Sequence, residues 1–224
     1  MDNLFSDPRD RIMAISNPVL PMPRHSDLPD LEIGRHRYLL AAGGVYLETR
    51  SRALRVAVRV MDASESSLPF GEVIPALTIG TDQHIPRELI AECVRLAKEA
   101  MPNEWAGVIV LQKGAFRLIV PPIIKATRAS IGYSTEGIDP LDVVVDLHSH
   151  NSMPAFFSSQ DDADDSANPT PVFVSMVLGR LDTDSPEMVS RVVVHRLSYD
   201  MNLNRMPLSN LSEPVAAQMA EEFS

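Results

Sequence analysis

The chain has 224 residues, a formal net charge of −10 and hydrophobic residues at 45% of its positions. This length suits one or two globular domains, and an acidic balance without a basic cluster disfavours nucleic acid as a direct partner. The single cysteine, Cys93, excludes an internal disulfide and fits a reducing cytoplasm. The N-terminus lacks the apolar stretch of a secretory signal, and the longest apolar run, at about 105–111, is too short to cross a bilayer. We therefore expect a cytoplasmic protein without a membrane partner.

The first 80 residues predict an extended segment followed by a small β module. Residues 1–33 are rich in proline and show little periodicity, which predicts an extended lead-in. Within the module, 34–80, a Gly43-Gly44 turn joins two apolar segments and predicts a β-hairpin. Alternating apolar residues over 54–60 predict a third strand, and 73–79 can add a fourth. No chemical motif lies in this module, so structural support is its default role.

The second part, 81–209, mixes one helix with several strands, and a tail follows at 210–224. Apolar residues at helical spacing predict an amphipathic helix up to Pro102, with Cys93 on its apolar face. Further strands are expected, in chain order, at 105–112, 116–120, 143–145, 172–178 and 191–197. His195 alternates with the valines of the last strand and is expected to be an ordinary strand residue. In the tail, 215–223 offers a short helical stretch.

Two histidines at the end of the 143–145 strand give the first chemical signal. His148 and His150 are two residues apart, so on a strand they project to the same side and can share one cation. Asp161 is the natural third ligand. The plainer interpretation is a surface histidine pair beside a solvated acidic loop. Calcium is disfavoured, because Ser166 and Ala167 follow the acidic run where a calcium loop has its glycine.

The joint spacing makes the metal interpretation specific. The pattern is His148-x-His150-x7-Ser158-x-x-Asp161, with Glu104-Trp105-Ala106-Gly107 upstream. This combination resembles the JAMM (MPN) metalloprotease family. The sequence around the motif is more narrowly similar to the protein A group of the bacterial PRTRC cassettes. The resemblance implies an α/β (α+β) fold, a cytidine-deaminase-like mixed sheet flanked by helices, here preceded by the small antiparallel β module.

The resemblance also implies a mechanism and partners. It implies one Zn²⁺ per chain held by His148, His150 and Asp161, with Glu104 accepting a proton from the attacking water and Ser158 donating to the oxyanion. The implied reaction is hydrolysis of a peptide or isopeptide bond after the C-terminal tail of a ubiquitin-like protein. That protein or its conjugate is then the implied partner, with an E1-like (ThiF-related) enzyme beside it. A connection of about twenty residues precedes the metal strand, and its segment 123–133 is the expected edge that seats the tail.

Two other functions fit parts of the pattern. The segment 146–150, Asp-Leu-His-Ser-His, also resembles the opening motif of PHP-type phosphoesterases. Those enzymes need many further histidines and acidic residues downstream, whereas here His195 is the one histidine that follows. A noncatalytic MPN scaffold without metal is the third interpretation, although retention of all five polar positions argues against it.

Overall fold

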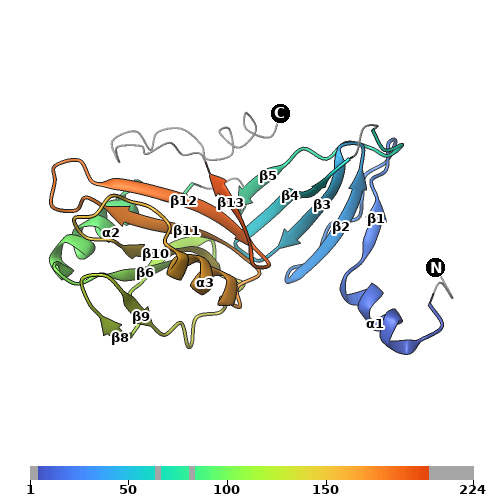
Figure 1. Cartoon of the computed structure of the whole chain (residues 1–224). Helices are drawn as coiled ribbons and strands as arrows, with labels where there is room; N and C mark the ends of the chain where they lie inside the picture. The colour runs from blue at the N-terminus through green and yellow to red at the C-terminus, as the bar shows by residue number, and fades with distance from the viewer. Residues whose placement is uncertain (1–4, 64–66, 81–83, 202–224) are drawn as a thin grey trace.

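A computed structural model describes residues 5–63, 67–80 and 84–201. Two large β-sheets lie side by side along the chain, and a two-stranded sheet and three helices accompany them in the described ranges (Figure 1). The mixed α/β architecture confirms the predicted fold class. No helix in these ranges is both long and apolar enough to cross a membrane.

The N-terminal sheet has the strand order β1-β2-β3-β4-β5. Its elements are α1 (Pro8–Ser16), β1 (Val19–Pro21), β2 (Arg35–Ala41), β3 (Gly44–Arg50), β4 (Leu54–Asp62) and β5 (Ala76–Ile79). The β2–β3 hairpin confirms the predicted turn, and its Gly44 has a φ of +136°, in a backbone region that suits glycine. Within the sheet, Arg37 and Glu48 form a buried ion pair at 2.6 Å.

The expected extended lead-in contains two short elements. Helix α1 begins where Asp7 accepts a hydrogen bond from the backbone N–H of Arg9 and Pro8 takes the first helical position. No residue of α1 is buried, so no apolar periodicity marks it in the sequence. Strand β1 then pairs in parallel with β2. The lead-in is therefore the edge of the N-terminal sheet.

The second sheet carries the predicted histidine strand and has the order β13-β12-β11-β10-β6-β7. Its elements and their neighbours are α2 (Arg87–Ala100), β6 (Ala106–Gln112), β7 (Ala115–Ile119), β8 (Ile123–Ala126), β9 (Ile131–Tyr133), β10 (Val143–Ser149), α3 (Ser159–Ala167), β11 (Val172–Gly179), β12 (Glu187–Val194) and β13 (Leu197–Met201). Strand β10 pairs antiparallel with β6 and parallel with β11. It is buried along almost its whole length, as its run of valines predicts.

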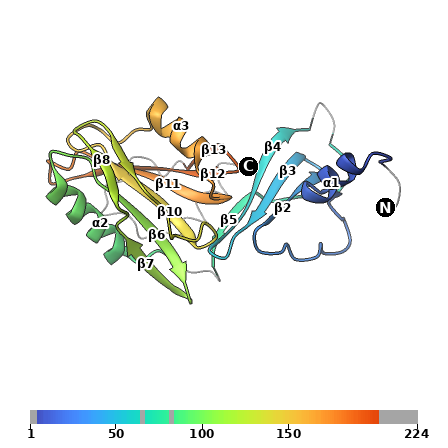
Figure 2. The ribbon, with the colours of Figure 1, turned by 90° about the horizontal axis from the view of Figure 1, so that it is seen from below.

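The two faces of this sheet have different neighbours. Val145 and Leu147 of β10 point into the large core that contains Ile90 and Cys93 of α2. Burial raises the pKa of the Cys93 thiol to about 12, in keeping with a core residue. Asp146 and His148 alternate with these residues and point to the opposite face. Figure 2 shows α2 and α3 on opposite sides of the sheet.

The two sheets share one hydrophobic core. Val56 and Val58 of β4 belong to the same buried cluster as Val174 of β11 and Val192 of β12. The turn after β3 adds polar contacts, because the backbone N–H of Arg52 donates to the Leu141 carbonyl and its Nε to Asp142 Oδ1 at 2.6 Å. The N-terminal sheet therefore packs as a support for the domain that carries the histidines.

The C-terminal part corrects one expectation. Strand β12 ends at Val194, and His195 and Arg196 form a two-residue turn into β13 with φ of 45° and 76°. His195 is thus in a turn, where its ring contacts that of His36 at a centroid distance of 4.5 Å. The expected helical stretch at 215–223 lies outside the described residues.

Candidate metal centre

Three predicted ligands converge on one point at the end of β10. The Nε2 atoms of His148 and His150 are 3.2 Å apart, and His148 Nε2 lies 3.0 Å from Asp161 Oδ1. His150 Nε2 lies 3.6 Å from Asp161 Oδ2. Within the described ranges this is the one group of three or more His, Cys, Asp or Glu side chains that can hold a metal ion, and one ligand atom from each lies within 4.8 Å of the others.

These separations fit a divalent metal ion. In a tetrahedral zinc site with bonds of about 2.0–2.1 Å, neighbouring ligand atoms are about 3.3 Å apart. The three measured distances scatter around that value. Two imidazoles and a carboxylate are also the N and O ligands that zinc accepts, and three protein ligands leave a fourth position open. His150 Nδ1 is buried and has no hydrogen-bond partner among the described residues.

The Ser-x-x-Asp spacing has a local structural cause. Ser158 is the N-cap of α3 and Asp161 its third residue, and together they form a capping box. Asp161 Oδ2 accepts the backbone N–H of Ser158 at 2.6 Å, which orients the carboxylate so that Oδ1 faces His148. The same pair of hydrogen bonds that starts the helix thus aims the third ligand.

Glu104 is close to the three ligands without being one of them. Its side chain is buried, lines the same cleft and comes from the segment just before β6. Burial raises the pKa of Glu104 to about 7, a rise opposed by the charge of His148 and reinforced by that of Asp161. A carboxylate poised near neutral pH is suited to accept a proton from water at the site.

Ser158 can donate a hydrogen bond while it caps the helix. Its Oγ accepts the backbone N–H of Asp161 at 3.3 Å. A hydroxyl has one donor and two acceptor positions, so the O–H of Ser158 remains available to the cleft that it lines. The structure therefore brings all five predicted site residues to one cleft: Glu104, His148, His150, Ser158 and Asp161.

Charge is unevenly distributed over the three predicted metal ligands. Burial opposes the positive charge of His148, but the hydrogen bond and the negative charge of Asp161 outweigh it and raise the pKa of His148. For His150, burial and the nearby His148 lower the pKa. Burial opposes the carboxylate of Asp161, yet the contacts with His148 and Ser158 hold its pKa well below the usual range. An ionised Asp161 beside histidines suits a site for a cation.

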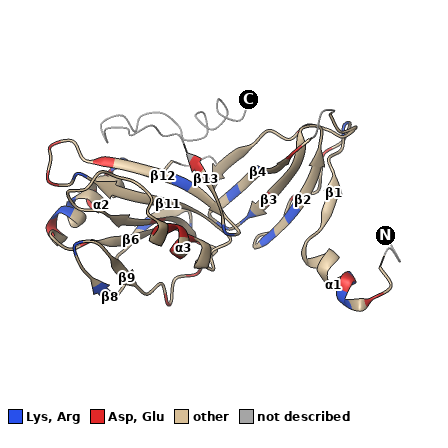
Figure 3. Cartoon of the chain, viewed as in Figure 1, with Lys and Arg blue, Asp and Glu red and all other residues tan. Residues whose placement is uncertain are grey.

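The cleft has a volume of about 540 Å³ and two distinct walls. Strand β10 is its floor, which Asp146 and His148 line. The β8–β9 hairpin supplies one wall through residues 129–133, and α3 supplies the other through Ser158, Asp161 and Asp164 among others. The hairpin occupies most of the connection expected to be a loop. Figure 3 shows α3 with its Asp positions in red.

Sequence reasoning missed the residue that holds α3 in place. Arg191, on β12, is buried and pairs through its Nε with Asp165 Oδ2 at 2.8 Å and through NH1 with Asp162 Oδ1 at 2.5 Å. Its guanidinium also lies 3.9 Å from the centre of the Phe157 ring. The acidic run is therefore a helix that Arg191 holds against the sheet. The sequence signal that could have indicated this contact is a lone arginine among the valines of β12.

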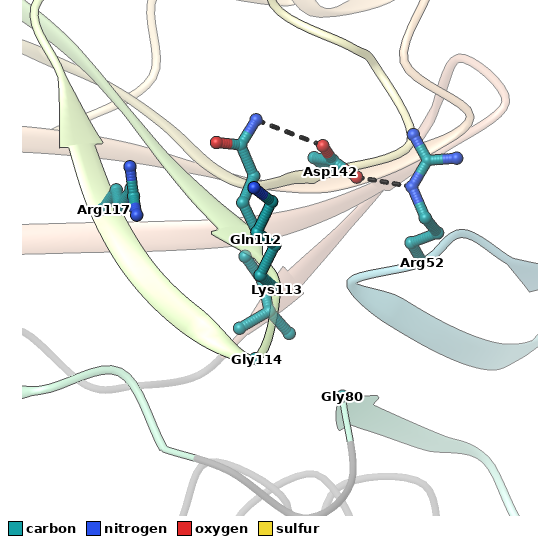
Figure 4. A pocket seen from close by; sticks show the side chains of 8 residues that line it. Arg52, Gly80, Gln112, Lys113, Gly114, Arg117 and Asp142 are labelled. Carbon is teal, nitrogen blue, oxygen red and sulfur yellow. Dashed lines mark hydrogen bonds and ion pairs between the residues drawn. The ribbon is translucent and has the colours of Figure 1, made fainter.

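A larger cavity lies away from this chemistry. It has a volume of about 660 Å³ and lies where Arg52 and Gly80 meet the β6–β7 turn (Figure 4). Asp142 bridges Arg52 and Gln112 across it, and none of the five predicted site residues lines it. The smaller cleft, with its convergent ligands, is the functional candidate.

Comparison with known proteins matches two parts of the chain to family models. Residues 86–194 match the family of prokaryotic homologs of the JAB domain, and residues 7–80 match a domain of unknown function, DUF2016. No curated protein gives a significant match. Among solved structures, the solution structure of a protein from Desulfitobacterium hafniense is 16% identical, with a TM-score of 0.39, over 50% of this chain and 85% of that one. The JAB-family match identifies residues 86–194 as a JAB domain of the prokaryotic type.

Proposed function

We propose that this protein is a zinc-dependent peptidase of the isopeptidase kind, which hydrolyses the bond after the C-terminal tail of a ubiquitin-like protein. The observation that carries the proposal is the convergence of two imidazoles and a carboxylate on one point, beside a buried glutamate that is not a ligand. A structural zinc site typically has four protein ligands, whereas three leave room for a reacting water.

Each of the five site residues has a separate role in the proposed reaction. His148, His150 and Asp161 would hold a zinc ion, which would supply Lewis acidity and lower the pKa of water to about 7. Glu104 accepts the proton of the attacking water and delivers it to the leaving amine, a contribution of about 10²- to 10⁴-fold. Ser158 donates its O–H to the oxygen that gains negative charge, a role worth about 10²- to 10³-fold.

The shape of the cleft supports an extended peptide as substrate. Strand β9 pairs only with β8, so among the described residues its other edge has no strand partner. Ile131 and Gly132 of β9 line the cleft. An extended tail can add to such an edge through main-chain hydrogen bonds and run toward the metal ligands. A ubiquitin-like tail with an E1-like partner, as in the PRTRC cassettes, is the specific form of this proposal.

The proposal is tested with the full chain and a ubiquitin-like protein that carries a fluorogenic amide on its C-terminal carboxyl group. We expect one zinc per chain by elemental analysis, and fluorophore release that a chelator stops and added zinc restores. Zinc binding without any cleavage would favour the MPN scaffold. Phosphate release from simple esters without peptide cleavage would favour the PHP-type reaction, although the single three-residue cluster in the described ranges argues against a multi-metal site.

A further inference from the structure

Asp146 is a buried carboxylate in the cleft that the proposed reaction does not use. It lies on β10 two residues before His148, on the same face of the strand. Its Oδ1 accepts the hydroxyl of Tyr133, from β9, and its Oδ2 accepts the side-chain amide of Asn168 at 3.1 Å. Asn168 is the C-cap of α3. Asp146 therefore connects the floor of the cleft to both of its walls.

A second side chain connects the hairpin on the other side of the histidine pair. Asn151 directly follows His150 and has a φ of 53°, a conformation that asparagine tolerates better than most residues. Its Nδ2 donates to the carbonyl of Arg128, in the β8–β9 turn, and to that of Pro102, both at 3.1 Å. The turn is also held by Glu104, whose backbone N–H donates to the Thr127 carbonyl at 2.8 Å.

These contacts bracket the metal ligands along the chain. One connection to the hairpin lies just before His148 and the other just after His150, and both use buried side chains. Burying a carboxylate costs free energy unless it is hydrogen-bonded. Packing alone therefore does not account for Asp146 in the cleft. Neither Asp146 nor Asn151 belongs to the metal-ligand cluster.

We infer that Asp146 and Asn151 are positioning residues that hold the β8–β9 hairpin as a preformed wall of the cleft, so that the edge of β9 is in register with the metal ligands before substrate arrives. This inference deepens the proposed function and rests on it for the identity of the substrate. Ordering a segment on binding lowers affinity, and a wall that is already ordered avoids that loss. The two residues should then act on KM more than on kcat.

Two substitutions remove the connections with little change to the backbone. Tyr133→Phe deletes only the hydroxyl that reaches Asp146. Asn151→Gly deletes the amide and keeps a residue that accepts positive φ. Their matched controls are Tyr38→Phe, on β2 in the N-terminal sheet, and Lys113→Gly, an exposed turn residue that also has a φ of 53°.

Amide hydrogen exchange of the full-length, zinc-loaded protein tests the inference without any substrate. We expect residues 123–133 to exchange about fivefold faster in each variant, as follows from losing one hydrogen bond of ordinary strength, while neither control changes there. Zinc content should equal that of the wild type in all four proteins. Unchanged exchange in both variants would overturn the inference, and so would faster exchange spread evenly over the whole chain.

Kinetics with the ubiquitin-like fluorogenic substrate supply the second measurement. We expect KM to rise about three- to tenfold in each variant, with a smaller change in kcat, since the lost hydrogen bond orders the wall and not the reacting atoms. A fall in kcat at constant KM would contradict a positioning role. If the wild-type protein cleaves nothing, the proposed function has failed, and the exchange measurement alone decides whether the hairpin is held in this way.

Discussion

Ser158 and Asp161 each accept a hydrogen bond from the other's backbone N–H at the start of α3. The carboxylate of Asp161 accepts at 2.6 Å and the hydroxyl of Ser158 at 3.3 Å. The two residues are also the proposed oxyanion donor and a proposed metal ligand. Helix stability and site geometry therefore depend on the same pair, and substitutions must be chosen to separate the two effects.

Ser158→Ala and Ser158→Gly separate helix capping from chemistry. Alanine is a poor N-cap and should lower the free energy of unfolding by about 1 kcal/mol, whereas glycine should cost only a few tenths. Both lack the hydroxyl, so we expect both to reduce kcat by about 10²-fold. Urea unfolding and steady-state kinetics on the two variants measure the two effects. Full activity of Ser158→Gly would show that the hydroxyl is not the oxyanion donor.

The convergence of the ligands could be predicted because it depends on local periodicity. Residues two apart on a strand point the same way, which brings His148 and His150 together without knowledge of the fold. The strand itself follows from its valines. Asp161 is more distant in sequence, so its proximity to the histidines could be predicted only from the spacing of the family motif. The capping box at Ser158 is nevertheless a recognisable sequence signal for the start of the helix.

The walls of the cleft depend on contacts that no local pattern reveals. Helix α3 has no apolar face, and its buried residues are Asp161 and Asp165. Asp165 pairs with a buried arginine on the distant strand β12, and Asp161 contacts the histidines of β10. Both strands of the β8–β9 hairpin are short, β8 is mostly exposed and β9 is half-buried, and the hairpin is held partly by the hydrogen bond from Tyr133 to Asp146. Because tertiary ion pairs and hydrogen bonds stabilise α3 and the β8–β9 hairpin, hydrophobic periodicity could not predict them.

Glu104→Gln should remove the proton acceptor while keeping the site intact. The side chain keeps its size and polarity, and Glu104 is not part of the ligand cluster. We expect normal zinc content and normal folding, with hydrolysis reduced at least about 10²-fold. Elemental analysis and kinetics on the same preparation check this. Loss of zinc in this variant would mean that Glu104 is a ligand, and full activity would move the base elsewhere in the cleft.

Asp161→Ala should fail in a different way from Glu104→Gln. It takes away one of the three proposed metal ligands and also the carboxylate that accepts the Ser158 backbone N–H. We expect loss of zinc together with activity, and a lower melting temperature because metal no longer stabilises the native state. Asp164→Ala, on the same helix but outside the ligand cluster, is the matched control and should retain zinc. Retention of zinc by Asp161→Ala would refute its assignment.

His36 and His195 form the last testable contact, between the N-terminal sheet and the β12–β13 turn. Their ring centroids are 4.5 Å apart, and His36 Nε2 lies 3.0 Å from Asn17 Oδ1. Burial lowers the pKa of His36. For His195, burial and then the charge of His36 lower the pKa. Both native-state values thus lie below the ordinary value of 6.5.

This contact predicts a pH dependence of stability with a definite sign. Because the two native pKa values are depressed, the unfolded chain binds more protons than the native state once pH falls below about 6.5. The contribution of this pair to the free energy of unfolding should then decrease as the pH is lowered from 7 toward 5.5, whereas Glu104, with its pKa raised to about 7, contributes in the opposite direction. His195→Asn removes one titrating ring and keeps a residue that tolerates the positive φ of 45°. We expect the decrease to be smaller in this variant, and unchanged in the control His25→Asn, which alters an exposed histidine. Urea unfolding at pH 5.5, 6.25 and 7 with zinc held constant measures the slopes, and equal slopes for His195→Asn and wild type would exclude the contact as their source.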